Sequence, residues 1–94
     1  MFPDLKSIRY LRDHLLELTF SDGTTGTLDF APLVTGKGGV FAPLEDKTYF
    51  ARATVNEDIG TVVWPNGVDF DPDVLYSQVT GKQIALDEDQ LMKR

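Results

Sequence analysis

The single histidine of the sequence lies beside an aspartate. His14 follows Asp13 between two segments that read as strands. A histidine can act as a general base near neutral pH, and a neighbouring carboxylate can orient its ring. Such a base also needs a nucleophile or a bound water, and two adjacent residues do not define the geometry of a catalytic triad. We therefore interpret His14 as a surface turn residue.

Three aspartates alternate along the chain in the spacing of the first calcium ligands of an EF-hand loop. Asp69, Asp71 and Asp73 match its positions 1, 3 and 5. The loop also requires glycine at position 6 and glutamate at position 12, where this chain has Val74 and Thr80. The aspartates are better explained as the start of a helix, and we expect no metal and no cofactor.

Residues 35–39 form the segment richest in glycine, and it contains Lys37. A phosphate-binding loop of the Walker type requires serine or threonine directly after this lysine, and here Gly38 follows. The segment also lacks large side chains that could pack. It predicts a flexible surface loop.

Three basic residues are close together near the start of the chain. Lys6, Arg9 and Arg12 are interspersed with Asp4 and Asp13. The whole chain carries 15 acidic and 9 basic residues, a net charge of −6, whereas phosphate contacts need clustered cations. This pattern favours a solvated strand face over a nucleic-acid site, so we expect no direct binding of nucleic acid.

Length and composition indicate one folded domain. The chain has 94 residues, of which 41% are hydrophobic and 26% are charged. There is no cysteine, which excludes disulfides and thiolate chemistry and is typical of a reducing compartment. No apolar run is long enough for a signal peptide or a membrane span. We expect a cytoplasmic protein with no membrane association.

Residues 61–76 organise the predicted fold, and they include the only tryptophan. Residues 61–64 are β-branched or aromatic and predict a strand, on which Trp64 serves as a core anchor. Pro65, Asn66 and Gly67 are turn formers, so the chain must change direction there. Residues 68–70 then resume extended structure.

A helix is predicted to follow directly. Asp71 is a good N-cap, Pro72 suits the first helical position, and Asp73 complements the helix dipole. Gly81 ends the helix.

The first half of the chain predicts strands over residues 8–11 and 15–20, with a hairpin at Asp22 and Gly23. A two-residue loop would place apolar residues opposite polar ones. A three-residue loop with a left-handed Gly23 places Leu16 opposite Leu28, and Glu17 opposite Thr27 on the solvated face. We prefer the second register.

Two short helices and a second hairpin complete the prediction. Asp29 can cap a helical turn over residues 31–34, and Asp46 a short helix that follows it. Residues 53–56 and 61–64 form the second hairpin. The predicted fold class is α+β: a small antiparallel sheet built from two hairpins, with short helices on one face. Residues 1–80 form the domain, and residues 81–94 are an acidic tail that is partly disordered or docks on a partner.

In combination, these motifs resemble the DUF2442 family of bacterial domains of unknown function. The resemblance covers roughly residues 5 to 78 and is carried by the Asp-Gly hairpin, the segments 28–33 and 41–44 with Phe50, and the Trp-Pro-Asn-Gly motif from Trp64 to Gly67. It implies a small cytoplasmic α+β domain without established catalytic residues. Some family members precede a helix-turn-helix domain, and others lie in gene pairs that resemble toxin–antitoxin modules. The residues after the resemblance are too few for a DNA-binding domain of that kind.

The sequence therefore favours a noncatalytic interaction domain that binds a protein partner or a second copy of itself. One alternative is a regulator associated with nucleic acid, and another is a small-molecule-binding protein or an enzyme that uses Asp69, Asp71 or His14. Structural roles are expected for Asp22, Gly23, Asp29, Trp64, Pro65, Asn66, Gly67, Asp71 and Pro72. The candidates for interaction are Lys6, Arg9, Arg12 and Asp69.

Overall fold

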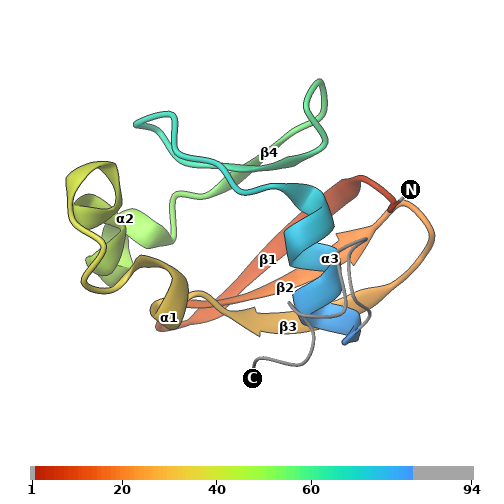
Figure 1. The fold of residues 1–94 in the computed structure, drawn as a ribbon, viewed down its shortest axis with the longest axis horizontal. Coiled ribbons are helices and arrows are strands. Elements are labelled where there is room, and N and C mark those ends of the chain that lie inside the picture. Colours follow the sequence, from red (N-terminus) through yellow and green to blue (C-terminus); the bar gives the residue numbers. More distant parts are fainter. Residues whose placement is uncertain (1, 82–94) are drawn as a thin grey trace, which may run out of the picture.

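The computed structural model describes residues 2–81, which form a three-stranded sheet, a two-stranded sheet and short helices (Figure 1). The elements in chain order are β1 (Leu5–Arg12), β2 (Leu15–Phe20), β3 (Thr25–Asp29), α1 (Ala31–Val34), the 3₁₀ helix η1 (Gly39–Glu45), α2 (Lys47–Phe50), β4 (Thr54–Asn56), β5 (Thr61–Val63) and α3 (Pro72–Thr80). Both sheets are antiparallel. The predicted α+β class is confirmed, while the predicted tail, except Gly81, lies outside the described residues.

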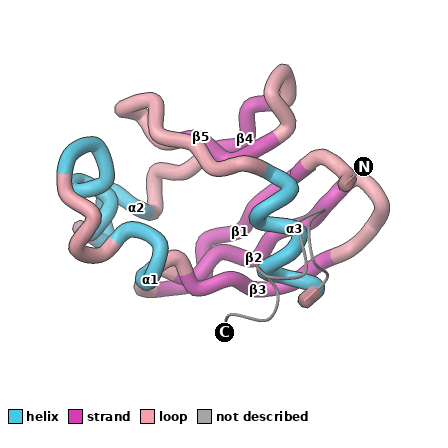
Figure 2. The backbone as a smooth tube through the Cα atoms, viewed as in Figure 1, coloured by secondary structure: helices cyan, strands magenta, loops and turns pink. Residues whose placement is uncertain are grey.

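The elements are arranged around one core. Figure 2 shows α3 lying across the sheet β1-β2-β3, while α1 and α2 gather at the opposite end. The hairpin β4–β5 passes above this sheet, and its turn meets the start of β1, where the Leu5 N–H donates to the Gly60 carbonyl at 2.9 Å. Each element therefore presents one side to the same interior.

The hairpin β2–β3 has the predicted three-residue loop and register. Leu16 lies opposite Leu28, and Glu17 lies opposite Thr27. Gly23 has a φ of 91°, the left-handed value that this loop requires. Leu16, Leu18 and Phe20 are fully buried, so a shift by one residue would expose them all.

The first strand is longer than the sequence predicted. Strand β1 runs from Leu5 to Arg12 rather than over residues 8–11, and its pairing with β2 is irregular near both ends. Lys6 and Ser7 are both polar and exposed, so the sequence pattern does not indicate that the strand begins before Ile8. Leu5 is nevertheless only 1% exposed, and it pairs with Phe20 of β2. The strand therefore begins before the apolar segment at residues 8–11.

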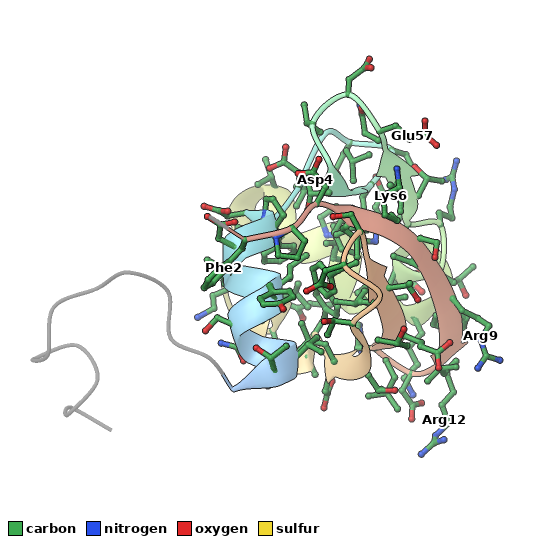
Figure 3. All side chains as sticks on the ribbon, turned by 90° about the vertical axis from the view of Figure 1, so that its right-hand side faces the viewer. Phe2, Asp4, Lys6, Arg9, Arg12 and Glu57 are labelled. Atoms are coloured by element: carbon green, nitrogen blue, oxygen red, sulfur yellow. The ribbon has the colours of Figure 1, made fainter. Side chains whose placement is uncertain are left out.

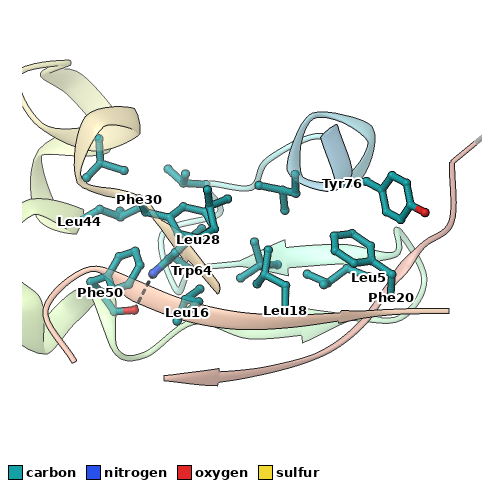
Figure 4. Packing of buried hydrophobic residues seen from close by; sticks show 14 residues of the cluster. Leu5, Leu16, Leu18, Phe20, Leu28, Phe30, Leu44, Phe50, Trp64 and Tyr76 are labelled. Atoms are coloured by element: carbon teal, nitrogen blue, oxygen red, sulfur yellow. Dashed lines mark hydrogen bonds between the residues drawn. The ribbon is translucent and has the colours of Figure 1, made fainter. Parts of the chain in front are cut away.

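Trp64 is at the centre of the aromatic part of the core (Figure 4). Its side chain is 2% exposed, and the rings of Phe30, Phe50 and Phe70 lie with their centroids 5.4 to 5.9 Å away. The indole Nε1–H donates a hydrogen bond of 2.8 Å to the Phe50 carbonyl. The predicted role of Trp64 as a core anchor is confirmed.

The turn after β5 folds the chain back on itself. The Gly67 N–H donates to the Trp64 carbonyl at 2.8 Å, and the Trp64 N–H donates to the Val68 carbonyl at 2.9 Å. Pro65 is exposed at the tip, and the Asn66 side chain donates to the Val40 carbonyl at 2.9 Å. The turn thus holds the first residues of η1 as well as reversing β5.

Helix α3 begins and ends where the sequence predicts. The Asp71 carboxylate accepts a bond of 2.9 Å from the Asp73 N–H, Pro72 occupies the first turn, and Gly81 has the left-handed φ of 78°. At α1, by contrast, the N-cap is Phe30. The Asp29 carboxylate instead accepts from the Ala31 N–H at 2.9 Å, so it bridges the turn before the helix.

Candidate functional site

His14 is buried, so its interpretation as a surface residue was wrong, although it does lie in the turn between β1 and β2. It is 9% exposed, and its ring centroid lies 4.8 Å from that of Phe50. Its Nε2 lies 2.9 Å from the Leu44 carbonyl oxygen. A carbonyl only accepts hydrogen bonds, so Nε2 carries the hydrogen and is already used in holding η1.

Asp13 does not orient the histidine. Its carboxylate lies 3.1 Å from the Lys47 Nζ and 3.7 Å from the Arg12 Nε. Its backbone is left-handed, with a φ of 50°, as the tight turn demands. Within residues 2–81, Asp13 and His14 therefore form no catalytic pair.

The basic residues that the sequence singled out lie along β1, one of the two edge strands of its sheet (Figure 3). Lys6, Arg9 and Arg12 are all exposed. The Arg9 Nε donates to the Glu17 carboxylate at 3.1 Å, and this bond together with the charge of Glu17 raises the pKa of Arg9. Arg9 and Arg12 thus both have acidic neighbours, which reduces the positive potential available to phosphate.

Strand β1 leaves the main-chain groups of Ile8 and Tyr10 free on its outer side, where the Leu5 N–H is already bonded to the Gly60 carbonyl. The Phe20 N–H donates to the Thr24 carbonyl, so the main-chain groups of every second residue of β2 point toward β3. Those of the residues in between, Glu17 among them, point toward β1. By the same alternation the main-chain groups of Ile8 and Tyr10 point away from β2. Among the described residues no strand pairs with β1 on that side.

One face of the three-stranded sheet is open. None of its side chains is buried, and they are mainly hydroxyl and charged groups: Ser7, Arg9, Leu15, Glu17, Thr19, Thr25, Thr27 and Asp29. The opposite face supplies Leu16, Leu18 and Phe20 to the core. The open face and the outer edge of β1, from Lys6 to Arg12, form a continuous surface that we call the β1 surface.

A second candidate site is an open depression of about 330 Å³ beside the start of α3. It is lined by Ile59, Thr61, Asp69, Phe70, Asp71 and Pro72. Ile59 is 48% exposed, although it is a large apolar residue, and the Thr61 hydroxyl is occupied by a bond of 2.6 Å to the Phe70 carbonyl. The sequence predicted Asp69 as an interaction residue but did not reveal that Ile59 lies beside it.

The aspartates of this region do not form a metal site. Asp69 and Asp71 line the depression, whereas Asp73 does not. Among the described residues no group of three or more histidine, cysteine, aspartate or glutamate side chains is arranged to hold a metal ion.

A polar contact that the sequence did not reveal joins α3 to the β2–β3 turn. The Tyr76 hydroxyl donates to the Asp22 carboxylate at 2.7 Å, and the Thr24 N–H donates to the same carboxylate at 2.9 Å. These bonds, chiefly that from Tyr76, lower the pKa of Asp22. Asp22 and Gly23 therefore form a turn that also binds the helix.

Fold and surfaces together define a small α+β domain with an open sheet edge. Residues 5–81 match the family described as Protein of unknown function (DUF2442), and the chain belongs to this family. No curated protein matches it. No helix within residues 2–81 has both the length and the apolar character needed to cross a membrane; the cytoplasmic location stays a prediction.

One solved structure is similar to this chain. It is that of the Putative DNA Binding Protein NE0471 from Nitrosomonas europaea, with a TM-score of 0.74 and 28% sequence identity. The match covers 86% of this chain and 51% of that one, so this chain spans about half the length of its neighbour.

Proposed function

We propose that the chain is a noncatalytic protein-interaction domain and that the β1 surface binds an extended segment of a partner protein or β1 of a second copy. The observation that carries this proposal is the outer edge of β1, where the main-chain groups of Ile8 and Tyr10 point away from the sheet. An exposed edge strand is a template for the addition of another strand.

The side chains on β1 support this proposal. Tyr10 is 38% exposed, yet its ring lies 6.3 Å from that of Phe50 and its hydroxyl donates to the Asp13 carbonyl. A partly exposed aromatic that is held in place can contact a partner with little loss of side-chain entropy. Arg9 and Lys6 add charge to the same edge and would select the sequence of the added strand.

The family resemblance suggests a biological setting. A partner encoded beside this chain, as in a toxin–antitoxin-like or other regulatory pair, would fit a small domain that acts by binding. The residues that follow Gly81 are a further candidate for partner contact.

The test uses two substitutions at the same residue. Tyr10→Pro removes an outward-pointing N–H, which a partner strand would need, without removing a bond to β2. Tyr10→Ala shortens the side chain in the same way but keeps the N–H. We expect Tyr10→Pro to abolish binding of the partner isolated with the wild-type chain from its native host, and Tyr10→Ala to weaken it less.

The assay requires purified components. The protein isolated from the host would be purified and titrated against each variant, and light scattering would measure self-association. Thermal unfolding of both variants would show that each is folded. A wild-type chain that is monomeric and enriches no protein over a control would contradict the proposal, as would equal binding by the two variants.

A second candidate function is a regulator associated with nucleic acid. The observation that favours it is the likeness to a structure named as a DNA-binding protein, together with the exposed Lys6, Arg9 and Arg12. Titration of a DNA duplex at rising salt would test it, because phosphate contacts lose affinity steeply with salt. A protein that shows no binding at low salt, or whose binding is unchanged by reversal of these three charges, would exclude it.

The third candidate, a small-molecule-binding protein or an enzyme, would have to use Asp69 or Asp71, since the His14 ring is buried and bonded to the Leu44 carbonyl. Replacing these aspartates without effect on any ligand-linked property would exclude this function.

A further inference from the structure

We infer that the depression beside α3 binds an arginine side chain carried by the partner. This inference rests on the proposed interaction function and specifies the chemistry of the partner. Its lining combines three apolar residues, Ile59, Phe70 and Pro72, which we call the floor, with two carboxylates, those of Asp69 and Asp71, which we call the rim. Both features are needed to select this side chain.

The floor is apolar and open. Ile59, Phe70 and Pro72 line it, and Ile59 is exposed although burial of such a side chain is favourable. A volume of about 330 Å³ is at the small end of the range of ligand pockets, about 300–1,000 Å³. The depression therefore fits one long side chain better than a cofactor.

The rim is negatively charged and has no basic residue. Asp69 forms no hydrogen bond or ion pair through its carboxylate with any residue from 2 to 81. The Asp71 carboxylate uses one oxygen, Oδ1, to cap α3, which leaves Oδ2 free. An incoming cation would thus meet two carboxylates that no cation of the described residues neutralises.

Arginine satisfies both the floor and the rim. Its methylene groups can cover Ile59 and Pro72 while its head remains at the rim, as long cationic side chains do on apolar surfaces. Its planar guanidinium can bond to a carboxylate and stack on the half-buried ring of Phe70. A metal ion fits less well, because two carboxylates beside an apolar floor supply too few oxygen ligands.

The position of the depression agrees with the proposed β1 surface. Gly60 connects the two: its carbonyl accepts from the Leu5 N–H of β1, and its neighbour Ile59 lines the depression. A strand that pairs along β1 and continues past Leu5 would bring its following residue to this region.

The experiment uses a blocked tripeptide, acetyl-Leu-Arg-Leu-amide, as the probe. It is titrated into ¹⁵N-labelled full-length chain at low salt, with acetyl-Leu-citrulline-Leu-amide as the uncharged match. We expect the arginine peptide to shift the amide signals of Ile59 and Phe70, and the citrulline peptide to bind more weakly. Higher salt should also weaken the binding of the arginine peptide, because salt screens exposed ion pairs.

The variant pair locates the charge. Asp69→Asn combined with Asp71→Asn removes both charges, and asparagine is as good an N-cap as aspartate, so α3 is preserved. Two exposed ion pairs account for about a fivefold change in dissociation constant, which is the weakening we expect. The control combines Asp29→Asn with Asp46→Asn, which removes two charges outside the depression and should leave binding unchanged. Like Asp71, each of these carboxylates accepts a bond from the N–H two residues further on.

Three results would overturn the inference: equal binding of the arginine and citrulline peptides, shifts confined to other parts of the chain, or unchanged affinity in the Asp69→Asn, Asp71→Asn variant. The proposed function is judged separately by Tyr10→Pro, which should bind the arginine peptide normally. Loss of partner binding in Tyr10→Pro together with a negative peptide result would retain the interaction function and reject the arginine site.

Discussion

The two ends of the core are held by different kinds of contact (Figure 4). At the end near α2, the Trp64 and His14 side chains donate to the main-chain carbonyls of Phe50 and Leu44, and all four residues are buried. We call this the carbonyl end. Such bonds are shielded from water, so removing the donor leaves a buried carbonyl without a partner.

At the other end, which we call the turn end, α3 is joined to the β2–β3 hairpin. The Tyr76 hydroxyl reaches Asp22, which is exposed, and Val79 lies directly over Gly26. The hydrogen bond between Tyr76 and Asp22 competes with water. The helix α3 can approach β3 closely because Gly26 has no side chain. The comparison indicates that polar substitutions should be severe at the carbonyl end and mild at the turn end, where shape decides.

The largest effect is expected at the carbonyl end for Trp64→Ala. Loss of the buried indole leaves a cavity and an unpaired Phe50 carbonyl, and large-to-small changes of this kind lower the free energy of unfolding by about 3–5 kcal/mol. Urea denaturation measures the change. Trp64→Phe keeps an aromatic ring and should cost less, and equal losses for the two variants would show that packing is not the main contribution.

At the turn end, Gly26→Ala should give the next largest loss. A Cβ at residue 26 would lie 2.4 Å from the Val79 Cγ1, so the Val79 side chain or the whole of α3 would have to move away from β3. Overpacking of this kind lowers the free energy of unfolding by about 1–3 kcal/mol.

A second substitution checks this explanation. Gly26→Ala should lower the free energy of unfolding less in the Val79→Ala background than in the wild type. A double-mutant cycle measures this difference. Additive losses would contradict the steric contact between the helix and β3.

His14→Leu tests the second buried bond of the carbonyl end. The leucine fills a similar space but cannot donate to the Leu44 carbonyl. A buried acceptor left unpaired lowers the free energy of unfolding by about 1–3 kcal/mol, which chemical denaturation measures. Asp13→Asn, next to it but exposed, should change stability by less than about 0.5 kcal/mol. A larger effect of Asp13→Asn than of His14→Leu would contradict the burial of the histidine.

The smallest effect is expected for Tyr76→Phe, and it should depend on pH. The pKa of Asp22 is lowered in the folded chain from its ordinary value of 3.8 because its carboxylate accepts from Tyr76 and Thr24. The ionised carboxylate therefore stabilises the fold above the unfolded pKa, and this contribution is lost as the pH falls through the folded pKa.

Removing the hydroxyl should make the free energy of unfolding fall less steeply on acidification below about pH 4. Denaturation curves of wild type and Tyr76→Phe across the acidic range measure this slope. Parallel curves would show that the Tyr76 hydroxyl does not interact with the ionised Asp22.

Several parts of the fold follow from neighbouring residues and were predicted correctly. The register of β2 against β3 follows from the alternation of Leu16 and Leu18 with polar residues and from the left-handed Gly23. The limits of α3 follow from the Asp71 cap and Gly81. Strand β1 was predicted too short because its outer residues are polar, and only its pairing with β2 shows that it extends to Leu5.

The candidate sites were predicted only as separate residues. Arg9 was recognised as an interaction candidate, but its bond to Glu17 and the free outer edge of β1 depend on which strand pairs beside it. Asp69 was also recognised, whereas the apolar floor beside it includes Ile59, a residue that belongs to the preceding hairpin.

The sequence by itself determined the local elements of this protein, because caps, turns and strand alternation depend on side chains only a few residues apart. Only the tertiary structure decided that His14 is buried against a carbonyl 30 residues away and that Tyr76 reaches an aspartate 54 residues away. Those partners are chosen by how the helices pack on the sheet. Packing depends on the shape of the whole core, which no short segment specifies.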